Sequence, residues 1–304
     1  MNVLNFLPMF NSSSALIRGD VIWWSIMVSI AVVGFIIMIV LFIKTFKWSK
    51  ERRELKVYFL LIRIFGAIFA SVALYRSIFV SSYPNRLSWF NTILNSPFII
   101  RTVALFAELS FIGIIALILW RMNKDFPLDV KHKSLAAFFK SIPFVAFACV
   151  FVANILAYAG LVTQYLTLFA IEETLWGIAF LLILPLVLAR LIRLKKTSNY
   201  HFSYKVFIIW MVAWCIGYSI FQWGFALPFM HWADVANDAS VVIPPDALLL
   251  SITGFRVTRD YYEWGGIGFF VWHSAYFSIC TWMVLSFMLG PRIEGTFLQM
   301  DESK

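Results

Sequence analysis

The residues of this chain that are able to do chemistry are charged side chains placed inside long apolar runs. Glu172 and Glu173 adjoin each other in the stretch AIEETLWGIAF, and Glu108 lies in a second apolar stretch. Arg76 and Arg101 have comparable surroundings. A charge at the centre of a membrane helix costs roughly 2.5–3.5 kcal/mol to insert. We therefore expect these groups to pair with one another or to bind a charged ligand.

A candidate site follows if these residues belong to helices that cross a membrane. Counted inward at about 1.5 Å per residue, the charged groups fall in one layer of the outer half, and the inner half is nearly bare. Three uncharged or weakly basic residues, Asn154, Gln222 and His273, fall in the same layer. The predicted ligand-binding residues are Arg76, Arg101, Glu108, Asn154, Glu172, Glu173, Gln222 and His273.

Pairing within this layer can be anticipated from helical geometry. Arg101 and Glu108 are seven residues apart, so they project from nearly the same face. We expect Glu172 or Glu173 to meet Arg76 or Arg101. Adjacent helical residues point about 100° apart, so at most one of the two acids faces squarely inward and the other faces a neighbouring helix or the outer vestibule. The layer holds three glutamates and two arginines, so one acid lacks an arginine. A proton, a histidinium or a bound cation could balance its charge. The alternative is that the ion pairs only fix the register between helices.

The composition of the chain supports helices that cross a membrane. Of 304 residues, 62% are hydrophobic and 13% are charged. A soluble domain carries about 25% charged residues. The net charge of +9 does not indicate a nucleic-acid partner, because the basic residues fall in particular short loops. Cys149, Cys215 and Cys280 lie far apart in apolar runs, which argues against a disulfide framework or a zinc site.

Seven segments are long enough to span the hydrocarbon core, which takes about 20 apolar residues. The predicted fold is therefore all-α: a polytopic seven-transmembrane-helix bundle formed as a single domain by residues 1–304. The predicted spans are Val21–Ile43, Val57–Val80, Phe98–Trp120, Ser141–Leu161, Leu166–Leu188, Val206–Pro228 and Gly266–Leu289.

The basic residues predict the direction of the spans. Lys and Arg gather in the loops that follow the first, third and fifth spans. By the positive-inside rule the N-terminus lies outside and the C-terminus is cytoplasmic, in a plasma or inner membrane. The segment Asp125–Lys140 mixes basic and apolar residues and is interpreted as lying along the inner membrane surface. The long outer loop at about 229–265 is interpreted as a lid, a re-entrant piece or a docking surface.

Tryptophans are expected at two depths. Most of them, Trp89 and Trp264 included, are assigned to the belts that mark the membrane interfaces. Deeper ones such as Trp176, Trp214 and Trp272 are interpreted as packing residues, with an aromatic pocket as the alternative.

Several cofactors and activities are disfavoured by what the sequence lacks. The last span has no lysine for a retinal Schiff base, and the spans hold no second histidine for a bis-histidine haem. No metal ligands are assigned. Motifs of common hydrolases and nucleotide-binding proteins, such as HExxH, GxSxG and the Walker sequence, are absent, so the sequence does not favour an enzyme.

Three functions remain open. The first is a membrane protein that binds, senses or transports a small or lipidic ligand in an ionisable pocket beneath the loop at 229–265. The second is a non-catalytic subunit that docks with other membrane proteins. The third is an intramembrane lipid-modifying enzyme. We favour the first, because polar groups from six helices converge at one depth, which is more than helix register alone requires.

Overall fold

The computed structural model describes residues 15–50, 56–83, 85–128, 131–196, 202–233, 235 and 242–289 of the chain. Within these residues, seven helical segments are long and apolar enough to cross a membrane, which confirms the predicted number of spans. Each segment overlaps its predicted range. The helices are α1 (Ala15–Lys50), α2 (Lys56–Ile78), α3 (Pro97–Asp125), α4 (Lys133–Thr163), α5 (Leu166–Lys196), α6 (Phe202–Phe221) with its π-helical extension η5 (Gln222–His231), and the continuous series α8 (Gly266–Ser274), η7 (Ala275–Ile279) and α9 (Cys280–Phe287).

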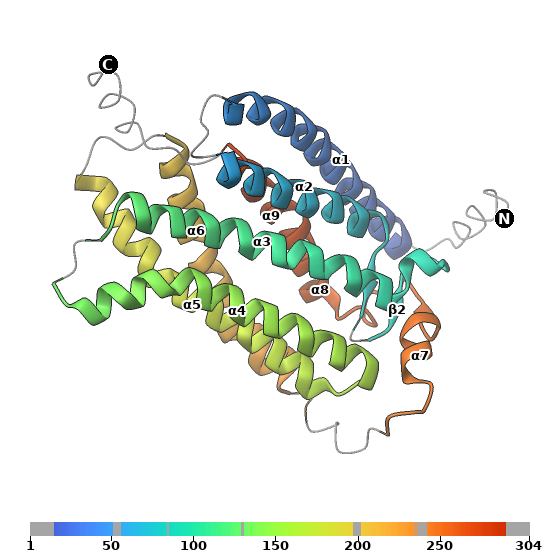
Figure 1. The fold of residues 1–304 in the computed structure, drawn as a ribbon. Helices are drawn as coiled ribbons and strands as arrows, with labels where there is room; N and C mark the ends of the chain where they lie inside the picture. Colours follow the sequence, from blue (N-terminus) through green and yellow to red (C-terminus); the bar gives the residue numbers. More distant parts are fainter. Residues whose placement is uncertain are drawn as a thin grey trace.

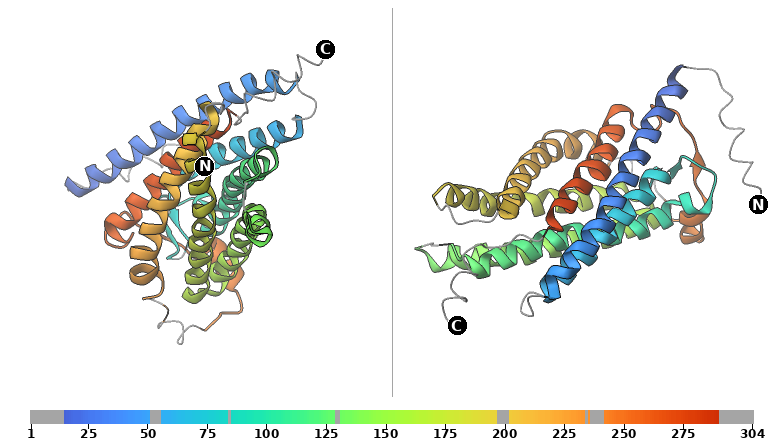
Figure 2. Two further views of the ribbon diagram at one scale, coloured as in Figure 1. Left: turned by 90° about the vertical axis from the view of Figure 1, so that its left-hand side faces the viewer. Right: turned by 90° about the horizontal axis from the view of Figure 1, so that it is seen from above.

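The helices form a bundle with α3 near its centre and α1 at its edge (Figures 1 and 2). In the most apolar stretch of α3, 61% of the residues are buried, compared with 22% in α1. Figure 2 shows α1 crossing obliquely over the outside of the other helices. A helix that is apolar on every side is suited to such a central position, which explains why α3 carries apolar residues all round. The large apolar side chains of α1 face outward, as lipid contact would require.

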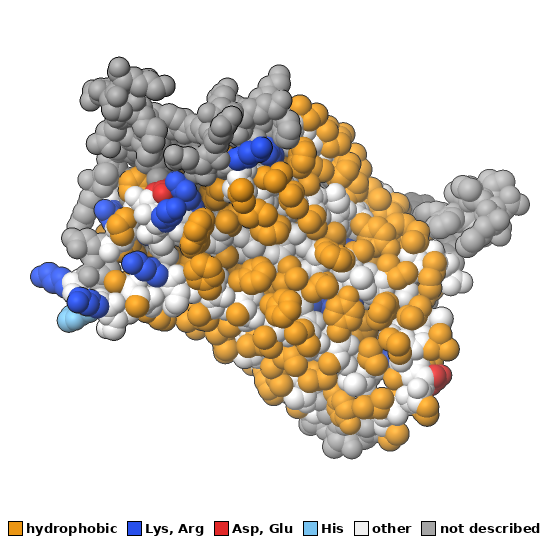
Figure 3. Space-filling view, in the orientation of Figure 1, with side chains coloured by type: hydrophobic (Ala, Val, Ile, Leu, Met, Phe, Trp, Pro, Cys, Tyr) orange, Lys and Arg blue, Asp and Glu red, His pale blue; other side chains and the backbone are white. Residues whose placement is uncertain are grey.

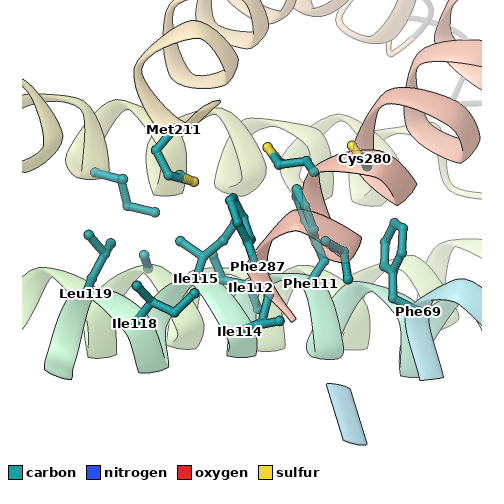
Figure 4. Close-up of a cluster of buried hydrophobic side chains, with 14 of the residues drawn as sticks. Phe69, Phe111, Ile112, Ile114, Ile115, Ile118, Leu119, Met211, Cys280 and Phe287 are labelled. Atoms are coloured by element: carbon teal, nitrogen blue, oxygen red, sulfur yellow. The ribbon is translucent and has the colours of Figure 1, made fainter. Parts of the chain in front are cut away.

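A packed apolar core fills the part of the bundle that lies along α3 beyond the charged residues Arg101 and Glu108. Phe111, Ile115 and Leu119 of α3 are fully buried, and Met211 of α6 and Phe287 of α9 meet them from neighbouring helices. Figure 4 shows these side chains interdigitating between the helices. Such packing approaches the density of an organic crystal and leaves little free space.

One end of the bundle, here called the sheet end, carries a small three-stranded sheet. Strands β1 (Ser81–Ser82) and β2 (Leu87–Ser88) form an antiparallel hairpin, and β3 (Arg256–Val257) from the long loop pairs parallel to β2. The short helices η4 (Ile93–Asn95) and α7 (Ala247–Thr253) lie at this end too. Figure 1 shows β2 and α7 together beyond the ends of α3 and α4. The long loop is therefore fastened across the sheet end by backbone hydrogen bonds.

Buried polar side chains hold the chain that joins α2 to α3 in place. Asn95 donates from Nδ2 to the Val80 carbonyl at 2.5 Å, and Ser88 donates from Oγ to the Asn95 carbonyl at 2.7 Å. Ser96 donates from Oγ to the Ile252 carbonyl at 2.7 Å, which attaches α7 to the start of α3. Because these three buried side chains each donate a hydrogen bond to the backbone, this connection can be a fixed wall of a site.

The opposite end, here called the basic end, carries most of the exposed lysines and arginines among the described residues. Figure 3 shows them gathered where α3 turns into α4, while apolar side chains cover the broad middle of the same face. The predicted surface segment is wrong in one respect: Lys133–Lys140 forms the first turns of α4, which runs unbroken to Thr163. The predicted sixth span also ended early, since η5 continues the helix past Pro228 to His231. Orientation in a membrane stays a prediction.

Candidate functional site

A cavity of about 390 Å³ lies between the helices just beneath the sheet end. Its wall includes five of the eight predicted residues, from helices α2, α3, α5 and α8. Of the other three, two form hydrogen bonds with wall residues and the third, Asn154, forms one with Arg101. The five are Arg76, Glu108, Glu172, Glu173 and His273, and the other three are Arg101, Asn154 and Gln222.

Arg101 and Glu108 form a two-pronged ion pair along α3. Arg101 Nη1 donates to Glu108 Oε1 at 2.7 Å and Nη2 donates to Oε2 at 3.1 Å. Asn154 of α4 accepts a further hydrogen bond from Nη2 at 2.6 Å, and it donates to its own helix at the Val150 carbonyl. The guanidinium is fully buried. An ion pair that is buried and also hydrogen-bonded can offset the cost of removing both charges from water.

Glu172 extends this cluster towards the sheet end. Its Oε1 lies 3.6 Å from Arg101 Nη1 and accepts a hydrogen bond from the Tyr83 hydroxyl at 3.3 Å. The Arg101 guanidinium lies over the face of the Tyr83 ring, and the Cζ atom of Arg101 is 5.2 Å from the ring centre. Burial, and then the negative charge of Glu172, raise the pKa of Tyr83, so its hydroxyl stays protonated and remains a donor. The expectation that one of the paired glutamates meets Arg101 is confirmed.

Glu173 points to a different neighbour. Gln222, the first residue of η5, donates from Nε2 both to Glu173 Oε2 and to the Glu173 carbonyl, each at 3.0 Å. Both glutamates are buried, with 2% and 8% of their surfaces exposed, and both line the cavity. They diverge as neighbouring helical residues must, one towards α3 and the other towards η5, and the cavity is wide enough to meet both. No Lys, Arg or His nitrogen of the described residues lies within 4 Å of the Glu173 carboxylate.

Arg76 is the second buried arginine, and it differs from Arg101. Its guanidinium lies over the Phe277 ring, 4.8 Å from the ring centre. Among the described residues, no carboxylate lies within ion-pairing distance of it. His273 lies beside Arg76, and its ring contacts those of Trp23, Phe269 and Phe277. The expected pairing of a glutamate with Arg76 is therefore not found in the described part of the chain.

Aromatic rings make up most of the remaining wall. Trp176 and Phe180 follow Glu173 on the same face of α5, and Trp214 and Tyr218 meet them from α6. Trp176 stacks on Phe180 with ring centres 5.9 Å apart, and Trp214 stacks on Tyr218 at 5.7 Å. Of the deeper tryptophans, Trp176, Trp214 and Trp272 line the cavity, so the aromatic-pocket alternative applies to them.

Two π-helical segments shape this wall. η5 carries Gln222 and His231, and η7 carries Tyr276 and Phe277, all of which touch the cavity or its acids. Wider helical turns of this kind are rare and occur often at functional sites. Gly177 permits the close approach of η5 to α5, since a Cβ there would lie 3.1 Å from Trp223 Nε1 and 3.2 Å from Gln222 Cγ.

Sequence reasoning missed several residues of the wall. Tyr83 and Trp264 come from loops, where no periodicity indicates which way a side chain points. Trp89 and Trp264 were assigned to the membrane interface, and this is wrong, because they are 1% and 2% exposed and pack together beneath the sheet. Strands and buried hydrogen bonds order the polar connection between α2 and α3, from which Tyr83 reaches the cavity.

Comparisons of the chain with known protein families, with curated protein sequences and with solved structures find no match. The site is therefore interpreted from its own geometry.

Proposed function

We propose that this chain is a multi-pass membrane protein that binds a small organic ligand in the cavity beneath the sheet end, with that end facing outward. The observation that carries the proposal is the cavity itself: about 390 Å³ of space in a buried position, walled by aromatic rings and by ionisable groups from four helices. Ligand sites commonly have this volume and this mixture of an apolar wall with a few polar groups.

The packing below the cavity favours binding or sensing over passage through the bundle. Phe111 is both part of the cavity wall and part of the packed core. Beyond it, Ile115, Ile118 and Leu119 are fully buried against the neighbouring helices. A transport route would have to open this core, whereas a binding site needs only the space above it.

The fastened loop supports the same proposal. Met230, His231, Trp264 and Gly265 of the long outer loop line the cavity from the sheet end. Backbone bonds from Arg256 N to the Arg86 carbonyl and from Thr258 N to the Ser88 carbonyl hold β3 in the sheet. These contacts support a lid among the three roles considered for the loop, and we propose that role for it.

The test is native mass spectrometry of the full chain, released in a mild detergent from its own membrane. We expect a single chain carrying a defined small-molecule mass. A blocking variant, Ser82→Trp, places an indole in the cavity wall and should abolish the bound mass. The matched control is Thr253→Trp, on the exposed side of α7, which should retain it.

Two results would contradict the proposal. One is a folded wild-type chain without any bound small molecule. The other is a bound mass that Ser82→Trp retains in full while the variant still melts cooperatively. A reproducible assembly with other chains and an unoccupied cavity would favour the alternative of a structural subunit.

A further inference from the structure

Two groups of opposite charge, Glu173 and Arg76, line the cavity without an ion-pair partner within 4 Å among the described residues, although His231 and Glu108 act on them from further away. Glu173 accepts hydrogen bonds only from the neutral amide of Gln222, and Arg76 has no carboxylate within ion-pairing distance in the described part of the chain. By contrast, Arg101, Glu108 and Glu172 each have a group of opposite charge within 4 Å. An uncompensated buried charge is strongly unfavourable, so both unpaired groups indicate a partner supplied by a ligand.

The surroundings of Glu173 suit a cationic group. Trp176 lies three residues further along α5, on the same face, and its ring belongs to a cluster with Phe180, Trp214 and Tyr218 that lines the cavity. Faces of aromatic rings attract ammonium groups, and a carboxylate among them adds an ion pair. This wall can therefore hold a protonated or quaternary amine.

The surroundings of Arg76 suit an anionic group. A guanidinium presents donors in a fork that matches a carboxylate or a phosphate. The guanidinium nitrogen Nε of Arg76 is buried without a hydrogen-bond partner among the described residues. The same is true of two nearby groups, His273 Nε2 and Tyr276 Oη. The charge of Glu108 reaches Arg76, but both carboxylate oxygens of Glu108 accept hydrogen bonds from Arg101. This wall is consequently short of negative charge.

We infer that the ligand of this cavity is a zwitterion, with its cationic nitrogen at Glu173 among the aromatic rings and its anionic group at Arg76. The inference rests on the proposed function. A ligand with a single positive charge would leave Arg76 unpaired, and a ligand with a single negative charge would leave Glu173 unpaired. One molecule that carries both charges satisfies both groups in one site. Free amino acids and zwitterionic lipid head groups share this chemistry.

The test compares two zwitterions with fragments that keep only one of their charges. The first set is L-tryptophan, tryptamine and indole-3-propionate; the second is glycerophosphocholine, choline and glycerophosphoglycerol, whose phosphodiester keeps the single negative charge. Binding to the full chain in a mild non-ionic detergent is measured by isothermal titration calorimetry. We expect at least one zwitterion to bind about tenfold or more tightly than both of its fragments, as hydrogen bonds to charged groups would give.

Variants then assign each charge to its residue. Glu173→Gln should weaken the zwitterion until it binds no better than its anionic fragment. Arg76→Gln should weaken it until it binds no better than its cationic fragment. The control is Arg121→Gln at the basic end, which should leave all affinities unchanged. The comparison of probes on the wild-type chain needs no variant, so it stands even if a substitution prevents folding.

The outcomes separate this inference from the proposed function. If only L-tryptophan binds tightly, the ligand is assigned as a free amino acid. If only glycerophosphocholine binds tightly, the ligand is assigned as a lipid head group. The inference is overturned if every zwitterion that binds has a fragment that binds as tightly, and also if both zwitterions fail to bind. If neither binds while the native chain carries a small molecule that Ser82→Trp removes, the pocket stands and only the zwitterion is refuted.

Discussion

Arg101 and Glu108 lie seven residues apart on α3, and their side chains meet along the helix in a two-pronged ion pair with a shortest distance of 2.7 Å. The two Cα atoms are separated by about 10 Å of helical rise, which two long side chains on one face can bridge. Asn154 supports the pair from α4. Both Nη atoms of Arg101 therefore have partners within the protein, whereas its buried Nε has none among the described residues.

The two buried arginines consequently differ in role. Arg101 joins α3 to α4 and α5, whereas Arg76 faces the cavity without a carboxylate partner among the described residues. Both belong to the predicted ligand-binding residues. We assign the register interpretation to Arg101 and propose the ligand interpretation for Arg76, because only Arg101 has carboxylates within ion-pairing distance among the described residues.

The buried pair should contribute strongly to stability. Arg101→Gln leaves Glu108 and Glu172 buried without a cation, and we expect the free energy of unfolding to fall by about 3–5 kcal/mol. The double variant Arg101→Gln, Glu108→Gln removes one of the stranded charges and should recover part of that loss. Denaturant unfolding in detergent micelles, followed by circular dichroism, measures both changes.

An exposed pair of the same kind provides the control. Arg256 and Glu263 are also seven residues apart and meet at 2.8 Å, but their side chains are 63% and 34% exposed. Arg256→Gln should change the free energy of unfolding by no more than about 1 kcal/mol. Equal losses for Arg101→Gln and Arg256→Gln would show that burial does not strengthen the α3 pair.

Orientation in the membrane can be measured with single cysteines. In a background where Cys149, Cys215 and Cys280 are replaced by alanine, a membrane-impermeant maleimide should label Tyr262→Cys in intact cells. Tyr262 is 82% exposed at the sheet end. His132→Cys, exposed at the basic end, should be labelled only after the cells are broken. The reverse pattern would contradict the predicted orientation.

The spans and the depth of the charged layer could be predicted from the sequence, because length, apolar character and helical rise determine them. The shared face of Arg101 and Glu108 was predictable for the same reason. Whether a given arginine finds a partner depends on side-chain reach between helices, so the difference between Arg76 and Arg101 was not predictable.

The loop residues of the wall were beyond prediction for a different reason. Tyr83 reaches Glu172 across 89 residues of sequence, and Trp264 is buried by the sheet that β3 completes. Both positions depend on how the two connections at the sheet end pair with each other. Neither helical nor strand periodicity extends through these connections, so no pattern in the sequence indicates their direction.

The hydroxyl and the ring of Tyr83 should make separable contributions. Tyr83→Phe removes the donor to Glu172 but keeps the ring below Arg101, and we expect a loss of about 1–3 kcal/mol in the free energy of unfolding. Tyr83→Ala removes both and should cost more. Tyr262→Phe, on a largely exposed tyrosine, is the control and should have little effect. A Tyr83→Phe chain as stable as wild type would refute a role for the hydroxyl.

The contact between α5 and η5 should depend on the absence of a side chain at Gly177. A leucine there would collide with Gln222 and Trp223, since a Cβ alone already lies within 3.2 Å of both. Gly177→Leu should displace Gln222 from Glu173, lower the melting temperature and weaken any ligand held at Glu173. Gly217→Leu makes the same change in α6 where nothing lies within 4 Å of the new Cβ, so it should retain both stability and binding. If both leucines behave alike, the close approach of η5 to α5 does not position the Glu173 side of the cavity.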